Sequence, residues 1–251
     1  MQSSASRSRV RATPLHAEFV SKHCIDMNTL TTIHHKCAHP CTFNCCLKKS
    51  APPPRPSLPE CRPYSGDISG MTWNPRAFFA RNGIKMNRRL SRVKDLSNKL
   101  DFFGLQETHS TPERAAALQI EFPKHSLFWS HCTLQRGGLA LGVYTKFLQR
   151  FSSVCWIEIQ PGRIGKLELR GRDGASDLYS IYLDDQSAQA RRHSFQLLSS
   201  NLAPKSDVLS MIFGDFNFVE HHHDRMCKTT SQFTGSRDSV DAVLFKELVL
   251  D

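Results

Sequence analysis

The apolar residues of this chain fall into short runs and helical repeats from about residue 67 onward. One repeat advances by steps of three and four residues, which predicts an amphipathic helix over residues 85–100. Its apolar positions are Met86, Leu90, Val93, Leu96 and Leu100. Apolar runs of strand length cover residues 68–74, 100–105, 127–130, 139–144 and 208–213. This part of the chain therefore mixes strands and helices.

Turn residues organise the middle of the chain. Three strand-like segments, at residues 154–159, 164–169 and 177–183, are separated by short turns that contain glycine, and this spacing is typical of an antiparallel meander. Gly137 and Gly138 form a turn before the strand at 139–144. Adjacent glycines at such a place indicate a close backbone approach or a bulge.

Local signals predict three further helices. Ser110 or Thr111 can cap a helix that has Pro112 in its first turn and runs to about residue 120. Residues 187–202 carry apolar side chains that align roughly on one helical face. A short helix is expected at residues 238–250.

Residues 1–66 show no sustained periodicity, and we expect them to form a low-complexity, disordered head with a proline-rich linker at its end. Six of the nine cysteines lie there. The spacing Cys37-x3-Cys41-x3-Cys45 and several histidines leave a zinc site open as an alternative. We favour an unstructured leader, because Pro40 interrupts the segment and no pair of CxxC elements is present.

The net charge of +10 favours polyanionic partners such as nucleic acid, although the excess is spread along the chain. No apolar segment is long enough to span a membrane, and the first twenty residues have no signal-peptide core. We therefore expect no membrane partner and an intracellular, reducing location, with the nucleus as a candidate, in which the cysteines remain thiols.

Polar side chains follow several of the predicted strands. Asn74 and Glu107 end two of them, and Asp215 and Asn217 end the run at 208–213. Tyr182 lies at the end of another strand. In α/β sheets, ligands bind beyond the carboxyl ends of strands, so these groups can converge on one rim. An oxygen-rich cluster of this kind suits Mg²⁺, which takes one or two carboxylates together with water and phosphate.

Five motifs in order resemble the endonuclease/exonuclease/phosphatase superfamily: TWN, LQETH, RGGLALGV, LYSIYLDD and IFGDFN, within residues 68–226. Within it, the chain most resembles the endonuclease domains of non-LTR (LINE-type) retrotransposons and their relatives of the apurinic endonuclease type. No single motif would suffice, but their order and spacing are specific. The resemblance implies, for residues 67–251, a four-layer α/β/β/α sandwich of two mixed sheets.

The resemblance also implies an activity, namely Mg²⁺-dependent endonucleolytic cleavage of DNA with contacts to its phosphate backbone; Mn²⁺ is an alternative metal. Glu107 would bind the metal, and Asn74 would assist the metal and the phosphate. Asp215 and Asn217 would orient the attacking water and contact the phosphate. Tyr182 matches a family tyrosine, although this chain reads YLDD where the family often has YxP.

The chain departs from the family near its C-terminus. Family members end with a Ser-Asp-His-like motif on a last strand, and this sequence contains none up to Asp251. We expect a sandwich that lacks its last strand, with an unpaired sheet edge. His221, His222 and His223 have no identifiable orienting partner, and we interpret them as a solvated loop rather than a replacement. The alternatives are an inactive remnant that keeps the fold and a phosphatase of the same superfamily.

Overall fold

The computed structural model describes residues 6–10, 23–26, 62–79, 83–133, 136–219, 229–230, 232 and 239–250. Its strands are β1 (Ser6–Val10), β2 (His23–Asp26), β3 (Ile68–Trp73), β4 (Phe102–Leu105), β5 (His125–Ser130), β6 (Leu139–Tyr144), β7 (Ser153–Gln160), β8 (Ile164–Gly171), β9 (Gly174–Tyr182) and β10 (Leu209–Asp215). Its helices are α1 (Gly83–Ser97), α2 (Pro112–Glu121), α3 (Thr145–Leu148), α4 (Ala188–Ser199), α5 (Ser239–Phe245) and the π-helical turn η4 (Lys246–Leu250).

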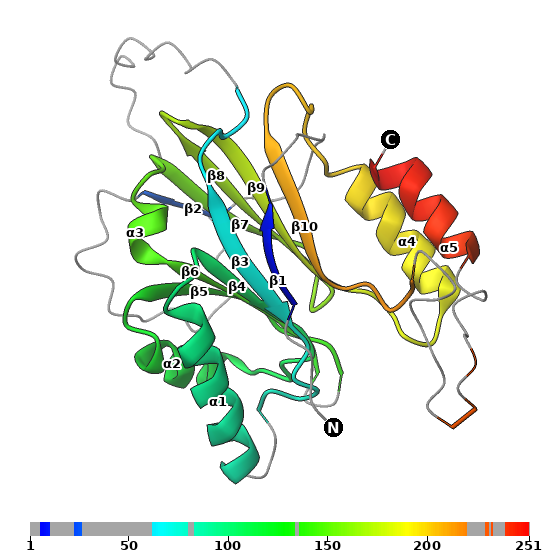
Figure 1. Cartoon of the computed structure of the whole chain (residues 1–251), viewed down its shortest axis with the longest axis horizontal. Helices are drawn as coiled ribbons and strands as arrows, with labels where there is room; N and C mark the ends of the chain where they lie inside the picture. Colours follow the sequence, from blue (N-terminus) through cyan, green and yellow to red (C-terminus); the bar gives the residue numbers. More distant parts are fainter. Residues whose placement is uncertain are drawn as a thin grey trace, which may run out of the picture.

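The strands form two mixed sheets, which are seen together in Figure 1. The first has the order β1-β3-β4-β6-β5, and the second β10-β9-β8-β7-β2. Each sheet contains one parallel pair, β3 with β4 and β9 with β10, and all other pairs are antiparallel. Because the carboxyl ends of parallel strands meet at one edge, each pair delivers two chain segments to the same place.

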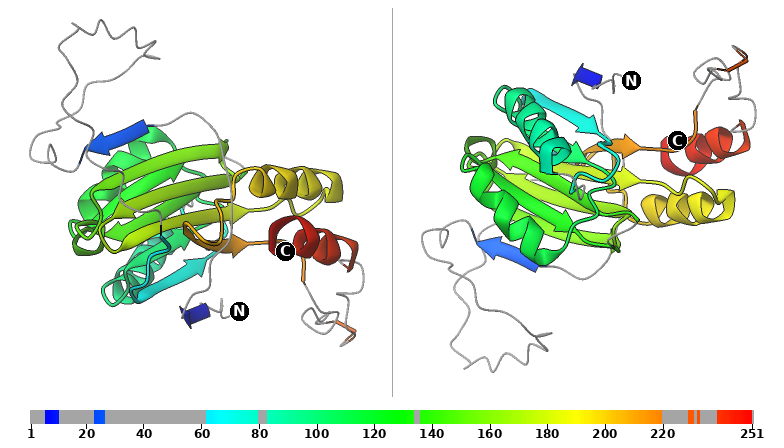
Figure 2. Two further views of the ribbon diagram at one scale, coloured as in Figure 1. Left: turned by 90° about the horizontal axis from the view of Figure 1, so that it is seen from above. Right: turned by 90° about the horizontal axis from the view of Figure 1, so that it is seen from below.

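The three largest apolar clusters give the molecule its layers. The first lies between the sheets and includes Phe102 and Leu141 of one sheet with Leu167 and Leu178 of the other. The alternation of inward and outward side chains along each strand supplies this face. Two helical layers lie outside the sheets, as the two views of Figure 2 show, with α4 and α5 side by side.

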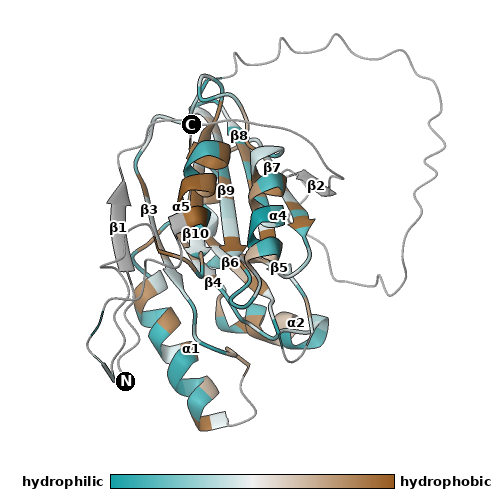
Figure 3. Cartoon of the chain, turned by 90° about the vertical axis from the view of Figure 1, so that its right-hand side faces the viewer, coloured by the Kyte–Doolittle hydropathy of each residue, from teal (hydrophilic) through white to brown (hydrophobic). Residues whose placement is uncertain are grey.

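The other two clusters attach the helices. Val93 of α1 and Leu118 of α2 pack on the outer face of the first sheet. Phe195 of α4 and Phe245 of α5 pack on the outer face of the second, against Tyr179 and its neighbours. Figure 3 shows the polar stretches of α1 and the predominantly apolar colour of α5. The expected four-layer sandwich of two mixed sheets is therefore confirmed.

Most predicted elements are present, with their ends shifted by a few residues. The meander of β7, β8 and β9 is antiparallel as expected. Thr111 caps α2 by accepting a hydrogen bond from the backbone N–H of Arg114, and Pro112 begins the helix. The short helix α3 was not predicted, because four residues are too few to display a helical period.

Two segments of the expected disordered head form strands in the structure, and the expectation for the rest of the head stays a prediction. Strand β1 pairs with β3, and β2 pairs with β7, so each sheet has four strands from the body and one from the head. Pairing at a sheet edge uses backbone groups, so a short strand can form there without an apolar period. The linker at 51–61 and the cysteines at 37–46 lie outside the described residues.

Strand β10 lies at the edge of the second sheet, next to β9 only. Among the described residues, no strand pairs with the other side of β10. Residues 220–228, which include the three consecutive histidines, lie outside them. Within the described part of the chain, no helix combines the length and the apolar character that crossing a membrane requires.

Candidate active site

The carboxyl ends of β3, β4 and β10 bring an amide and two carboxylates into contact. Nδ2 of Asn74 donates hydrogen bonds to Oε1 of Glu107 at 2.8 Å and to Oδ2 of Asp215 at 2.7 Å. Strand register explains the meeting, because Trp73 pairs with Leu105 at the ends of the parallel strands β3 and β4. Asp215 comes from the other sheet, so the cluster joins the two sheets at one rim.

Asn74 uses all of its side-chain N–H groups on these carboxylates. Its Oδ1 accepts a further hydrogen bond from the backbone N–H of Arg76 at 2.8 Å. An asparagine side chain carries only two N–H donors, so none is left for a phosphate in this arrangement. The assistance to the metal and the phosphate that the resemblance assigns to Asn74 stays a prediction. In the structure, its amide holds Glu107 and Asp215 together.

The backbone around the cluster is unusual. Every non-glycine residue with positive φ among the described residues lies within three positions of Asn74, Glu107 or Asp215: Arg76, Ala77, Glu107, His109 and Asn217. Glu107 itself has φ of 48° and Asn217 of 50°. Such conformations cost free energy and concentrate at functional sites, where surrounding contacts hold them in place.

Gly137 and Gly138, which precede β6, accept hydrogen bonds from the segment that follows Glu107. The backbone N–H groups of Thr108 and His109 donate to the carbonyl groups of Gly138 and Gly137, at 3.1 and 3.2 Å. Gly138 has φ of 88°, and a Cβ atom there would lie 2.5 Å from Oγ1 of Thr108. Of the two sequence interpretations of this pair, close backbone approach is the one observed.

Tyr182 lies at the end of β9, in register with Asp215 of β10. Burial raises the pKa of its hydroxyl, and the negative charge of Glu107 and a hydrogen bond to that side chain raise the pKa further. The phenol therefore stays protonated at neutral pH and can act as a donor. Cζ of Arg163 lies 4.6 Å from the ring centroid, within the range of a cation–π interaction.

Asn217 is tied to the ends of both parallel strands of the second sheet. Its backbone N–H donates to Oδ1 of Asp215 at 3.1 Å, and its Nδ2 donates to the carbonyl of Leu183 at 2.8 Å. One of its two amide hydrogens is thereby used, and no described residue accepts the other. The structure therefore gathers all five sequence-predicted residues at one rim.

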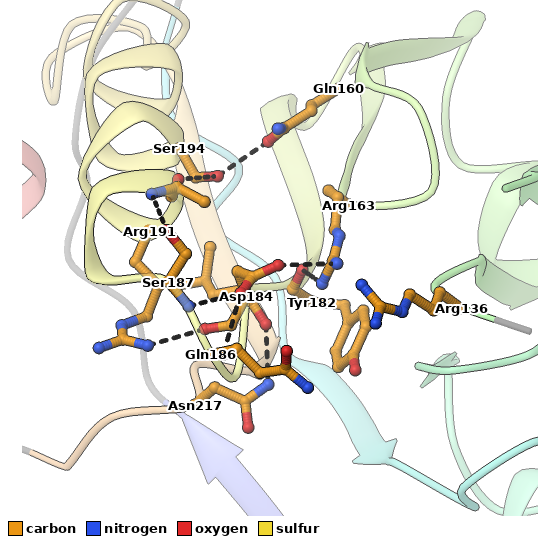
Figure 4. A network of polar contacts seen from close by, with 12 residues as sticks. Arg136, Gln160, Arg163, Tyr182, Asp184, Gln186, Ser187, Arg191, Ser194 and Asn217 are labelled. Atoms are coloured by element: carbon orange, nitrogen blue, oxygen red, sulfur yellow. Dashed lines mark hydrogen bonds and ion pairs between the residues drawn. The ribbon is translucent and has the colours of Figure 1, made fainter.

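Asp184 occupies the position at which the resembled family often has proline, and Figure 4 shows it among the polar contacts beside Tyr182. Its Oδ1 accepts from the backbone N–H groups of Gln186 and Ser187 at 2.9 and 2.7 Å, and its Oδ2 lies 3.0 Å from Nη2 of Arg163. Burial acts to raise the pKa of Asp184, but these hydrogen bonds and the arginine charge outweigh it, so the pKa lies below its usual range. Where a proline would restrict the backbone, Asp184 holds the turn through hydrogen bonds from its side chain.

Sequence reasoning missed Arg163 and Asp184 as parts of this rim. The acidic pair in YLDD could have indicated Asp184, which lies two positions from Tyr182. Nothing in the sequence near Arg163 indicated that it pairs with Asp184. His109 was also given no role. Burial lowers the pKa of His109 and the charge of Glu107 opposes this, so its imidazole is mainly neutral at pH 7.

The donor atoms of the cluster fit a small, hard cation. Glu107 and Asp215 offer carboxylate oxygens, and the side-chain amide of Asn217 offers a carbonyl oxygen nearby. Oxygen atoms of these kinds are the ligands that Mg²⁺ prefers. No group of three or more His, Cys, Asp or Glu side chains with metal-binding geometry occurs among the described residues. These donors suit an ion that keeps several water ligands, as Mg²⁺ does, rather than an ion that is enclosed by protein ligands.

Comparisons with known proteins bear on the fold of the chain. No protein-family model matches the chain. The chain is 30% identical over 172 residues to the Transposon TX1 uncharacterized 149 kDa protein of Xenopus laevis; the match covers 67% of this chain and spans 12% of that protein. It is similar in structure to AP endonuclease LMAP from Leishmania major, with a TM-score of 0.53 and 20% identity, covering 71% of this chain and 65% of that one. A second similar structure is an AP endonuclease from Archaeoglobus fulgidus, with a TM-score of 0.51 and 15% identity, covering 71% of this chain and 70% of that one.

Proposed function

Because the chain has the fold of the endonuclease/exonuclease/phosphatase superfamily, we propose that it is a Mg²⁺-dependent phosphodiesterase, a DNA endonuclease of non-LTR retrotransposon origin. The observation that carries this proposal is the contact of Asn74 with Glu107 and Asp215 at the rim where both sheets meet. Similarity to a transposon protein supports the origin.

The chemistry requires neutralisation of a phosphodiester, whose negative charge repels nucleophiles. Glu107 is the principal ligand for Mg²⁺ in this proposal, and Asp215 faces the same space. When bound, the ion would supply positive charge to the phosphate and to the leaving oxygen. Asn74 holds the two carboxylates at fixed positions before substrate arrives, which lowers the cost of reorganisation.

Asp215 is the residue that aligns water and accepts its proton. Each of its oxygens already accepts one hydrogen bond, from Asn74 and from the backbone of Asn217, and each retains a lone pair. The remaining amide hydrogen of Asn217 acts as a neutral donor to a phosphate oxygen, and the hydroxyl of Tyr182 donates to Glu107 and helps to position that carboxylate. Neutral donors stabilise negative charge without adding a charge that would have to be desolvated.

The direct test is nicking of supercoiled plasmid by the full chain with Mg²⁺, with and without a chelator. Glu107→Gln keeps the shape of the side chain and removes its charge, so it is a matched control. We expect nicking by the wild type that disappears with the chelator and in the variant. A folded chain that does not nick would indicate an inactive remnant, and phosphate release from a small phosphomonoester in place of nicking would indicate a phosphatase.

A further inference from the structure

Two arginines from different loops flank Tyr182. Arg163 precedes β8, and Arg136 belongs to the loop before β6. These loops are joined directly, because the backbone N–H of Gly138 donates to the carbonyl of Gly162 at 3.1 Å. In Figure 4 the side chains of Arg136 and Arg163 both point toward Tyr182, and Cζ of Arg163 lies 4.6 Å from the centroid of its ring.

The two guanidinium groups differ in how their charge is balanced. Arg163 is largely buried and pairs with Asp184 at 3.0 Å, while its Cζ lies over the Tyr182 ring. Arg136 is exposed and forms no ion pair with any described residue. Asp184 therefore pairs with Arg163, and the acids Glu107 and Asp185 also act on Tyr182, whereas Arg136 is the positive charge beside this rim that no described acid pairs with.

We infer that Arg136 binds a backbone phosphate of the substrate next to the one that is cleaved, on the Tyr182 side of the site. This inference rests on the proposed function and deepens it, because a second phosphate contact selects a polynucleotide strand over an isolated phosphomonoester. A guanidinium offers paired N–H donors that match phosphate oxygens. Arg163 is a positioning residue, because its ion pair with Asp184 holds it against the Tyr182 ring.

The test measures affinity for a fluorescent duplex oligonucleotide by anisotropy at a series of salt concentrations, with chelator present so that no cleavage occurs. Arg136→Gln should weaken binding about tenfold at low salt. It should also reduce the slope of log K against log salt by about 1, as expected for the loss of one phosphate contact. Arg136→Lys should retain most of the slope, because the positive charge remains.

Arg172 provides the matched control. It is exposed and lies in the turn after β8, at the opposite end of that strand from Arg163. Arg172→Gln removes the same charge and should leave the salt slope unchanged. The inference is overturned if Arg136→Gln has the wild-type slope, if Arg172→Gln reduces the slope as much, or if the wild type does not bind the duplex. If binding depends on Arg136 but the chain does not nick, the inference holds and the proposed endonuclease activity is wrong. If the chain nicks but Arg136→Gln leaves the slope unchanged, the proposed activity holds and the inference is wrong.

Discussion

The side-chain amide of Asn74 lies 2.7 Å from the carboxylate of Asp215, although 141 residues separate them in the sequence. The same nitrogen lies 2.8 Å from Glu107. One neutral residue thus bridges two acids that come from different sheets. Without a donor between them, two carboxylates that contact the same nitrogen would repel one another.

Asn74→Ala should lower the rate of plasmid nicking about 100-fold, because both acids lose the group that holds them. Thr72→Val is the control. Thr72 lies two residues earlier on β3 and donates to Oε1 of Gln106 at 3.1 Å, away from the acids. Its replacement should leave the nicking rate within about threefold of the wild type. Equal losses in both variants would show that Asn74 has no special role.

Gly138→Ala should displace the Glu107 segment. The added Cβ would meet Oγ1 of Thr108 at 2.5 Å, and the residue has φ of 88°, which an alanine adopts only with strain. We expect a loss of about 1–3 kcal/mol in the free energy of unfolding, together with reduced nicking. Gly83→Ala, where a Cβ would meet no atom within 4 Å, serves as the comparison in urea unfolding. A Gly138→Ala variant as stable and as active as Gly83→Ala would contradict this account.

Asp184→Asn should lower stability by about 1 kcal/mol at pH 7, because it removes the carboxylate that pairs with Arg163 and accepts two backbone N–H groups. The pKa of Asp184 in the folded chain lies below its ordinary value of 3.8. Its contribution is therefore complete above about pH 4 and is lost as the pH falls through the folded pKa. Urea unfolding at pH 7 and at about pH 3 should show the two proteins converging; a constant difference would exclude this origin.

Tyr182→Phe should reduce nicking about 10-fold to 100-fold, since it removes one donor at the rim. Because burial and Glu107 raise the pKa of Tyr182, its hydroxyl remains a donor across neutral and mildly alkaline pH. Below about pH 10, the pH–rate profile of the wild type should therefore have the same shape as that of the phenylalanine variant. A decline near neutral pH that only the wild type shows would place the ionisation of Tyr182 much lower than its environment indicates.

The sequence was sufficient for the core strands and for the rim. Asn74, Glu107 and Asp215 each follow an apolar run. The parallel pairing of β3 with β4 accounts for the meeting of Asn74 and Glu107, and Asp215 reaches them from the other sheet. The glycine pair beside Thr108 was also readable, although sequence alone left two interpretations of it. These features depend on local pattern together with one general rule of sheet topology.

Other features depend on register and side-chain direction, which local pattern does not encode. Arg163 meets Asp184 because β8 and β9 pair with Ile164 opposite Ile181, which places the turn before β8 beside the end of β9. The two edge strands from the head pair with β3 and β7 in registers that local pattern does not indicate. The saturation of the Asn74 amide could not be anticipated, since it requires the positions of both acids.

The central claim is that Glu107 and Asp215 act together in one phosphodiesterase site, and a double-mutant cycle on the nicking rate tests it most directly. The measurement compares the wild type with Glu107→Gln, Asp215→Asn and the double variant at one Mg²⁺ concentration. Residues that act as a unit give non-additive losses, so the double variant should be about as slow as the slower single variant. A double variant whose loss equals the product of the two single losses, or single variants that nick at the wild-type rate, would contradict the claim.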